Sequence, residues 1–310
     1  MDLIIQVGLL AIGFFMLVKG ADYFVDGAAG IATKFGIPQL VVGLTIVAMG
    51  TSAPEAAVSI TGAMSGAADI AVGNIVGSNI LNILIILGIT GVIATVAVQK
   101  STLFVEIPFM LFVTVVLIFL GLSGNELTFV EGIIFWVLFI VYLIYLYVLA
   151  KKGTDEEKTE DRAVWKLILF ILIGGAVVVW GANISVNAAT AIAQAIGISE
   201  KFIGLTIVAL GTSLPELVAS VTAARKGNAD IAIGNIVGSN IFNILFVLGT
   251  SALIVPVPYE ASFLFDGIIA IAAGVILWLA TIRKKSLGRV WGIIMLLCYA
   301  AYVAYLLMFQ

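Results

Sequence analysis

Hydrophobic residues occur in long, nearly unbroken runs, separated by short segments that hold most of the charged residues. A membrane-spanning helix needs about 20 apolar residues, and ten runs come close to or exceed that length. The pattern therefore predicts an all-α polytopic membrane protein with ten transmembrane helices. The approximate predicted spans are 3–31, 38–65, 70–96, 102–121, 127–150, 163–195, 199–224, 230–255, 261–281 and 289–308.

Composition supports this interpretation and excludes several functions. Of the 310 residues, 62% are hydrophobic and 11% are charged, whereas soluble proteins carry about 25% charged residues. A soluble enzyme is excluded. The chain has no histidine, and Cys298 is its single cysteine, which argues against a disulfide framework and a thiolate or imidazole metal site. We expect no cofactor and no enzymatic activity. A net charge of −3 gives no reason to expect nucleic acid binding, and no obligate protein partner is evident.

The chain contains an internal repeat. Residues 36–90 and 197–251 align without a gap at a constant offset of 161, with 34 identities in 55 positions. Each half of the chain then contains five predicted spans. Because five is odd, the second half enters the membrane from the opposite side, which predicts two inverted repeats.

The basic residues indicate the orientation. If both termini lie outside, 13 of the 15 lysines and arginines fall in inner loops or at inner span ends, as the positive-inside rule requires. We therefore expect a multi-pass protein of the cell membrane. Its first five-helix repeat is expected at 1–150, with its alpha motif at 36–90. A cytoplasmic linker follows at 151–162, and the second repeat occupies 163–310, with its motif at 197–251.

Two acidic residues fall in the middle of predicted spans, at equivalent positions of the repeat. Glu55 ends a GTSAPE segment and Glu216 ends a GTSLPE segment. A charged side chain at the centre of a span costs about 2.5–3.5 kcal/mol on insertion scales. An ion pair or hydrogen bond between helices is the structural alternative, but neither segment contains a basic residue. The pair is therefore predicted to bind a cation.

Neighbouring residues add oxygen atoms. A proline precedes each glutamate and lacks the N–H that a helix needs, so we expect each helix to break near Gly50 and Gly211 and to free main-chain carbonyls. The following span of each repeat contains a GNIVGSN segment, whose glycines and remaining asparagines can equally serve helix packing. Eight neutral side chains complete the predicted oxygen cluster: Thr51, Ser52, Thr212, Ser213, Ser78, Asn82, Ser239 and Asn243.

An all-oxygen cluster suits hard cations, with Ca2+ taking about six to eight oxygen ligands. Two fixed negative charges are neutralised by one Ca2+ or by two or more Na+. An empty site would carry unpaired carboxylates through a low-dielectric barrier, which is strongly penalised. The sequence therefore favours an antiporter with Na+ and Ca2+ as substrates.

The paired GTSxPE and GNIVGSN segments closely resemble those of the sodium/calcium exchanger family of calcium/cation antiporters, and this resemblance covers essentially all ten spans. It implies that Glu55 and Glu216 are the central ligands shared by both ions, and that the carbonyls of Ala48 and Ala209 contribute. It further implies alternating access by movement of spans one and six. Asn243 stands where some members have an aspartate, so a potassium requirement is not expected.

Three alternatives stay open at this point. A proton-coupled calcium antiporter could use the same carboxylates. A gated cation channel would conduct without coupling, and a membrane scaffold would tolerate Glu55→Gln and Glu216→Gln. Outside the motifs, Lys19 is expected to pair with Asp22 or to extend toward an interface. Asp22 and Asp26 align with Asn183 and Asn187 and are expected to be solvated near a helix end or to line an ion path.

Overall fold

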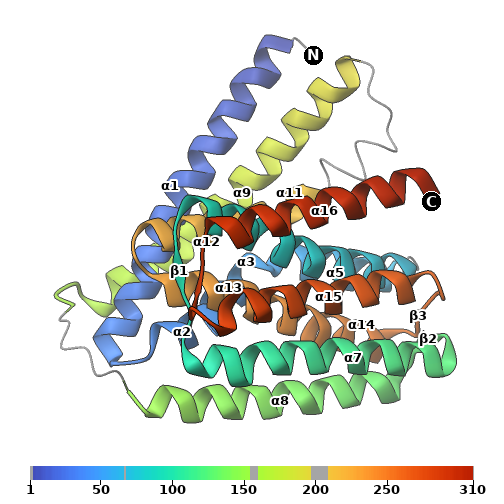
Figure 1. Ribbon diagram of the computed structural model, residues 1–310. Coiled ribbons are helices and arrows are strands. Elements are labelled where there is room, and N and C mark those ends of the chain that lie inside the picture. Colours follow the sequence, from blue (N-terminus) through green and yellow to red (C-terminus); the bar gives the residue numbers. More distant parts are fainter. Residues whose placement is uncertain (1–2, 66–67, 154–159, 197–208, 310) are drawn as a thin grey trace.

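The computed structural model describes residues 3–65, 68–153, 160–196 and 209–309 (Figure 1). Helices make up almost all of this part of the chain. The first half contains α1 (Leu3–Phe35), α2 (Gln39–Val42), η1 (Gly43–Val47), α3 (Ala48–Thr51), α4 (Ala53–Met64), α5 (Asp69–Leu81), η2 (Asn82–Leu87), α6 (Gly88–Ile93), β1 (Val96–Ala97), η3 (Thr102–Glu106), α7 (Ile107–Gly124), β2 (Glu126–Leu127) and α8 (Phe129–Lys151). The second half contains α9 (Val164–Ala195), α11 (Ala209–Thr212), α12 (Leu214–Arg225), α13 (Ala229–Phe242), η5 (Asn243–Leu248), α14 (Gly249–Ile254), β3 (Val257–Pro258), α15 (Phe263–Ile282), β4 (Ser286–Leu287) and α16 (Arg289–Phe309). Elements labelled η are π-helices.

The helices match the predicted spans in most places. Within the described residues, eight helical stretches are long and apolar enough to cross a membrane, and the bent pair 39–51 and 53–64 makes a ninth candidate. The expected span 199–224 lies partly outside the described residues. Three predicted boundaries were off by three or four residues. The first helix continues past position 31 to Phe35, the helix of the third expected span ends at Ile93 before β1 begins at Val96, and α7 continues past position 121 to Gly124.

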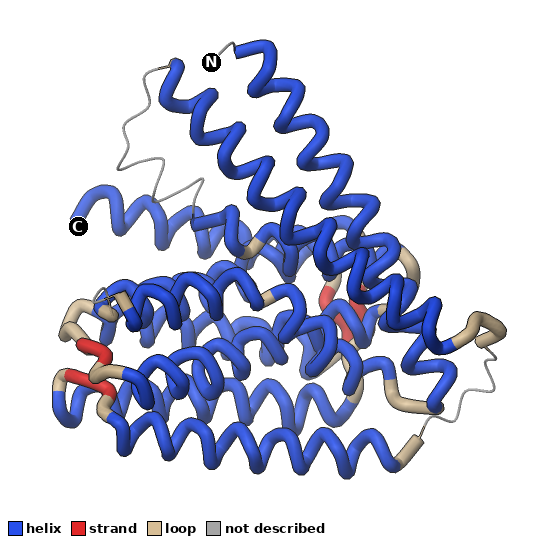
Figure 2. Tube along the Cα trace, turned by 180° about the vertical axis from the view of Figure 1, so that it is seen from behind, coloured by secondary structure: helices blue, strands red, loops and turns tan. Residues whose placement is uncertain are grey.

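The two longest helices, α1 and α9, lie side by side and run at a steep angle to the other helices, as Figures 1 and 2 both show. Glycines let their backbones approach closely. A Cβ atom added at Gly20 would lie 2.8 Å from the Val178 nitrogen. Between them is a small hydrophobic core of their own, formed by Leu17, Ala21, Val178 and Ala182. Small residues at the contact are typical of helix pairs in membranes.

Two pairs of very short antiparallel strands connect distant parts of the chain. Val96 and Ala97 pair with Leu287 and Ser286, and Glu126 and Leu127 pair with Pro258 and Val257. Figure 2 shows the two strand pairs at opposite ends of the bundle. The all-α prediction did not anticipate them, because two-residue strands carry no hydrophobic periodicity. Each pair ties a loop of the first half to a loop of the second.

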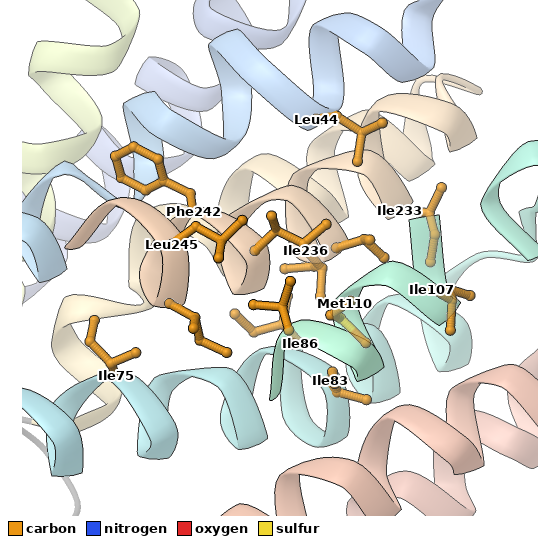
Figure 3. Packing of buried hydrophobic residues seen from close by; sticks show 14 of the residues in the cluster. Leu44, Ile75, Ile83, Ile86, Ile107, Met110, Ile233, Ile236, Phe242 and Leu245 are labelled. Carbon is orange, nitrogen blue, oxygen red and sulfur yellow. The ribbon is translucent and has the colours of Figure 1, made fainter. Parts of the chain in front are cut away.

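The main core lies around the helices that carry the GNIVGSN segments. α13 is buried from Ile231 to its end at Phe242, and most of η5, α5 and η2 is buried with it. Figure 3 shows side chains of this core, among them Leu44, Ile75, Ile236 and Leu245. Lipid is as apolar as these side chains, so close packing and polar contacts between helices, rather than the hydrophobic effect, hold such a core together. Polar residues inside it are therefore structurally important.

Ion pairs connect the second half of α1 to the residue that follows α12. Lys226, just after α12, lies 3.2 Å from the Asp22 carboxylate and 2.9 Å from that of Asp26. Lys19 lies 3.8 Å from Asp22, which confirms the predicted i, i+3 pair. Further along, Lys34 donates to the main-chain carbonyl of Glu160. Hydrogen bonds from Arg162 lower the pKa of the Glu160 carboxyl to about 2, so it is ionised at neutral pH.

Candidate functional site

Both GTSxPE segments interrupt their helices at the serine. Ser52, with φ −81° and ψ 7°, separates α3 from α4, and the helix bends by 50° there. Ser213, with φ −92° and ψ 5°, separates α11 from α12 in the same way. The break was predicted near Gly50 and lies two residues later. Proline is tolerated in the first turn of a helix, so α4 starts immediately before Pro54 and the break falls on Ser52.

The two glutamates converge, and each is bound by the opposite repeat. The Ser52 hydroxyl donates to Oε1 of Glu216 at 2.8 Å, and the Ser213 hydroxyl donates to Oε1 of Glu55 at 3.1 Å. All four side chains are at most 1% exposed. The carboxylates also lie close enough to interact electrostatically. The expected convergence of the acidic pair is therefore present, although each serine contacts the glutamate of the other repeat rather than its own.

Asparagines from α5 and α13 form a second set of matched contacts. Asn79 donates to the main-chain carbonyl of Asn240, and Asn240 donates to that of Asn79, both at 3.1 Å. Asn82 donates to Oδ1 of Asn240 at 3.0 Å, and Asn243 donates to Oδ1 of Asn79 at 3.1 Å. These bonds hold the two GNIVGSN helices together. They also fix the amide orientation of Asn82 and Asn243, with both NH2 groups turned toward the partner helix.

Four oxygen atoms in this cluster are buried and accept no hydrogen bond. They are Oε2 of Glu55, Oε2 of Glu216, Oδ1 of Asn82 and Oδ1 of Asn243. Leaving a buried acceptor unpaired costs about 1–3 kcal/mol, and more when the group is charged. Each repeat supplies one carboxylate and one amide oxygen to this set. Hard cations are bound by carboxylate and amide oxygens of this kind, so the four atoms are suited to hold a cation.

The other predicted residues lie around the same cluster. The Thr51 hydroxyl lies 3.0 Å from the Val47 carbonyl and 3.0 Å from Oδ1 of Asn235, and it also lies near Glu216. Ser239 donates to the carbonyl of Ala48 at 3.4 Å, and both residues are fully buried. Thr212 is half-buried and lies near Glu55.

The last two predicted residues are less completely described. Ser78 is buried one helical turn before Asn82. Ala209 begins α11, and its side chain lies outside the described residues.

A cavity of about 490 Å3 reaches the cluster from one side. It lies between α4, α9 and α11, and it is lined by Pro54, Val58, Asn183, Gly211 and Thr212 among others. An added Cβ at the equivalent glycine of the first repeat, Gly50, would lie 2.9 Å from the buried ring of Phe24 in α1, and one at Gly211 would lie even closer to the half-buried Val186 of α9. The residue that aligns with Phe24 in α9 is Ser185. A fully buried ring therefore covers the α1 side of the cluster, whereas a half-buried valine and a neighbouring cavity lie on the α9 side.

The sequence matches the profile of the family described as "Sodium/calcium exchanger protein" over residues 5–148 and 166–308. This match covers nearly the whole chain. The chain belongs to the sodium/calcium exchanger family. As a member of a transporter family built on apolar helices, it is a membrane antiporter for cations, and the resemblance stated from its motifs is confirmed.

Individual relatives resemble the chain over almost their full length. The putative antiporter CaxA of Alkalimonas amylolytica is 40% identical over 304 residues, covering 94% of this chain and 95% of that protein. The sodium/calcium exchanger MaX1 of Methanosarcina acetivorans is 34% identical, covering 96% and 97% of the two chains. A solved structure of the sodium-calcium exchanger NCX_Mj, soaked with Na+ and without Ca2+, superimposes with a TM-score of 0.83 at 33% identity and covers 98% of this chain.

Two features of this exchanger were not anticipated from its sequence. Asn235 donates to Ser220 at 2.9 Å, and Asn74 makes the matching bond to Ser59, so these asparagines join neighbouring helices rather than face the four unpaired oxygens. Packing and ligand roles had both been open for them, and their position in GNIVGSN could not decide between the two. The π-helices η2 and η5, which begin at Asn82 and Asn243, were also missed. One extra residue in a turn leaves no mark on hydrophobic periodicity.

Proposed function

We propose that this chain is a secondary active antiporter that exchanges Na+ for Ca2+ by alternating access at the cluster around Glu55 and Glu216. The observation that carries the proposal is the set of four buried, unpaired oxygens contributed in equal parts by the two repeats. The names of MaX1 and NCX_Mj as sodium/calcium exchangers support the choice of ions.

Each predicted residue has a role in this proposal. The glutamate and asparagine oxygens are the direct ligands, and both ions share the carboxylates. The serine hydroxyls hold the glutamates in place through their cross-repeat hydrogen bonds and can rotate toward an ion. The remaining oxygens complete the shell as ions of different number and charge replace one another: Thr51, Thr212, Ser78, Ser239 and the carbonyls of Ala48 and Ala209.

Charge balance enforces exchange. One Ca2+ neutralises the two carboxylates, and so do two Na+, with any further Na+ held by neutral oxygens. In either loaded form the cluster can be enclosed between the helices. Without an ion, two buried carboxylates would lie together without a cationic partner, and burial of unpaired charge costs several kcal/mol per ion. The empty carrier therefore changes conformation slowly, which prevents uncoupled movement of either ion.

We further propose ten spans arranged as two inverted five-helix repeats in the cell membrane, with both termini outside. The repeats occupy 1–150 and 163–310 and are joined by a cytoplasmic linker at 151–162. The strand pairs support this topology. The loops that carry β1 and β4 are both expected inside, and those that carry β2 and β3 are both expected outside. Each loop pairs with the one expected on its own side.

Alternating access is proposed to occur by movement of α1 and α9 relative to the other helices. These two helices pack on each other around Leu17, Ala21, Val178 and Ala182, and they stand at a steep angle to the rest (Figure 1). In the proposed topology, the cavity beside α9 faces outward, and Phe24 closes the inward side. The conformation described is then open toward the outside.

The test is calcium uptake into liposomes that contain the purified protein. An outward Na+ gradient and a pH gradient are applied separately, and Glu55→Gln and Glu216→Gln serve as matched inactive controls. We expect uptake with the Na+ gradient alone, and none in either variant. Uptake with the pH gradient alone would identify a proton-coupled antiporter instead. Calcium flux that needs neither gradient would identify a channel, and full activity in both variants would contradict the assignment of the site.

A further inference from the structure

A third carboxylate is buried in the bundle away from the proposed exchange cluster. Glu106, at the end of η3, is 1% exposed, and its Oε1 accepts a hydrogen bond from the Tyr145 hydroxyl of α8. Its Oε2 is buried without a hydrogen-bond partner. Among the described residues, Glu106 takes part in no ion pair. A buried carboxylate oxygen in this condition needs a cationic partner or a proton.

Three hydroxyl groups lie next to this carboxylate, and none of them makes a hydrogen bond of good geometry. They belong to Ser101 and Thr102, one helical turn before Glu106, and to Tyr142 of α8. Thr102 and Tyr142 are at most 3% exposed. The ring of Tyr142 is held by stacking on Phe109, with centroids 5.6 Å apart. Together with Oε2 of Glu106, these hydroxyls place four buried oxygens in one small region, with those of Ser101 and Thr102 next to the carboxylate.

The backbone at this position has the same local form as the backbone at the exchange cluster. Three of the four π-helices among the described residues adjoin the cluster: η1 ends just before Ala48, η2 begins at Asn82 and η5 begins at Asn243. The fourth, η3, runs from Thr102 to Glu106. A π-helical turn costs helix stability and is found frequently at functional sites. Its presence at Glu106 is independent of the unpaired oxygens and points to the same residues.

The Glu106 cluster lies near the surface of the bundle. A cavity of about 210 Å3 beside it is lined by Val105, Glu106, Phe109, Val141, Tyr142 and Tyr145. Because Val105 and Val141 are exposed, this cavity opens on the apolar outer surface of the bundle. Ser101 is only half-buried, and Lys100 before it is exposed. The cluster thus lies one turn from the end of its span, within reach of the water at that end.

We propose that Glu106, Ser101, Thr102 and Tyr142 form a binding site for one monovalent alkali cation, Na+ in the first instance, separate from the exchange cluster. The donors are all oxygen, which favours a hard cation over a soft one. One carboxylate is neutralised by one Na+, whereas Ca2+ would leave a net positive charge buried. The proposal for this site is independent of the exchange cluster and holds whether or not that cluster exchanges ions.

The test compares purified proteins that differ only at Glu106. Equilibrium binding of radioactive Na+ is measured to saturation in the wild type, in Glu106→Gln, in Glu55→Gln/Glu216→Gln and in the triple variant. We expect Glu106→Gln to lower the saturating amount by one Na+ per chain in both backgrounds. Because only this difference is read, the result does not depend on how many ions the exchange cluster holds. The proposal is overturned if Glu106→Gln binds as much Na+ as the wild type and the triple variant binds as much as Glu55→Gln/Glu216→Gln.

Asp266→Asn is the matched control. Asp266 also accepts a hydrogen bond from a tyrosine of the neighbouring helix, Tyr302, at 2.8 Å, but it is only half-buried and has no buried unpaired oxygen. We expect no change in bound Na+. If Glu106→Gln does not yield folded protein, Tyr142→Phe removes a single hydroxyl and is expected to weaken Na+ binding by up to about tenfold. An unchanged affinity in Tyr142→Phe then overturns the proposal.

Discussion

The centre of the ion cluster and the helices that cover it differ in how far the two sequence repeats match. At the centre, the contacts of the glutamates with the serines and those among the asparagines have counterparts: Ser52 binds Glu216 as Ser213 binds Glu55. In the cover, which consists of α1 and α9, the residues of the two repeats do not match. Phe24 in α1 aligns with Ser185 in α9, and the acidic Asp22 and Asp26 align with Asn183 and Asn187.

This difference separates two tasks of the proposed exchanger. An ion must find the same ligands whichever side of the membrane it comes from. Equivalent ligands in the two repeats meet this requirement. The direction in which the cluster is open must differ between conformations. A cavity beside α9 and a buried phenylalanine beside α1 create such a difference. In the proposed mechanism, the matched contacts bind the ion and the unmatched ones decide which side is open.

The largest expected effect is at the centre. Glu55→Gln and Glu216→Gln each remove a charged ligand but keep the size of the side chain. We expect each to lower sodium-driven calcium uptake by at least about 100-fold, since interactions of buried charged groups are worth about 3 kcal/mol or more. The two losses should be similar, because the two glutamates have matching contacts. Full uptake in one variant would show that the centre is not functionally symmetric.

A smaller effect is expected from the serines. Ser52→Ala and Ser213→Ala each remove one hydrogen bond to a carboxylate, worth about 1.5–3 kcal/mol. We expect Ca2+ affinity to fall by about 10- to 100-fold in each, measured by the Ca2+ concentration at half-maximal uptake. Thr45→Ser is a suitable control, because the Thr45 hydroxyl bonds to the Val41 carbonyl of its own helix. If the two serine variants differed clearly in the Ca2+ concentration at half-maximal uptake, the two repeats would not contribute equally to the centre of the cluster.

The sequence predicted the centre better than the cover, and the reason is physical. Carboxylates in the middle of apolar spans are costly enough to mark a site by themselves. A proline two residues after Ser52 then indicated a broken helix. By contrast, Phe24 is one phenylalanine in an apolar helix, and nothing in its neighbours distinguishes a ring that covers Gly50 from one that faces lipid. That distinction depends on where α1 lies.

Contacts between residues far apart in the chain could not be predicted from the sequence either. Lys226 precedes a predicted span and was assigned only to the inner side, and Asp22 and Asp26 were expected to be solvated or to line an ion path. The structure joins all three in an ion-pair cluster. Charge signs alone did not reveal this, because Lys226 lies at least 200 positions from both aspartates in the chain.

The cover can be tested by chemical accessibility. In a Cys298→Ser background, a single cysteine at Asn183, which lines the cavity, should react with a membrane-impermeant maleimide added outside intact cells. A cysteine at Phe24 should react at least about tenfold more slowly, because that side chain is 2% exposed and reaction requires access of the reagent to the thiolate. Labelling is followed by mass shift. Equal rates would mean that both sides of the cluster are equally open.

The smallest effect is expected from the ion pairs between α1 and Lys226. Lys226→Gln removes the ion pairs to Asp22 and Asp26, whose side chains are 35% and 43% exposed. Partly exposed pairs contribute about 1 kcal/mol or less. If the pairs hold α1 in the conformation described, their loss shifts the balance between conformations by about fivefold at most, and the Asn183 cysteine should label more slowly by that factor. Lys19→Gln is the control, because Lys19 is 55% exposed and lies 3.8 Å from Asp22. Added salt should reduce the effect of Lys226→Gln, since it screens exposed charges. A labelling rate unchanged by Lys226→Gln at low salt would show that packing around Phe24 alone keeps the inner side closed.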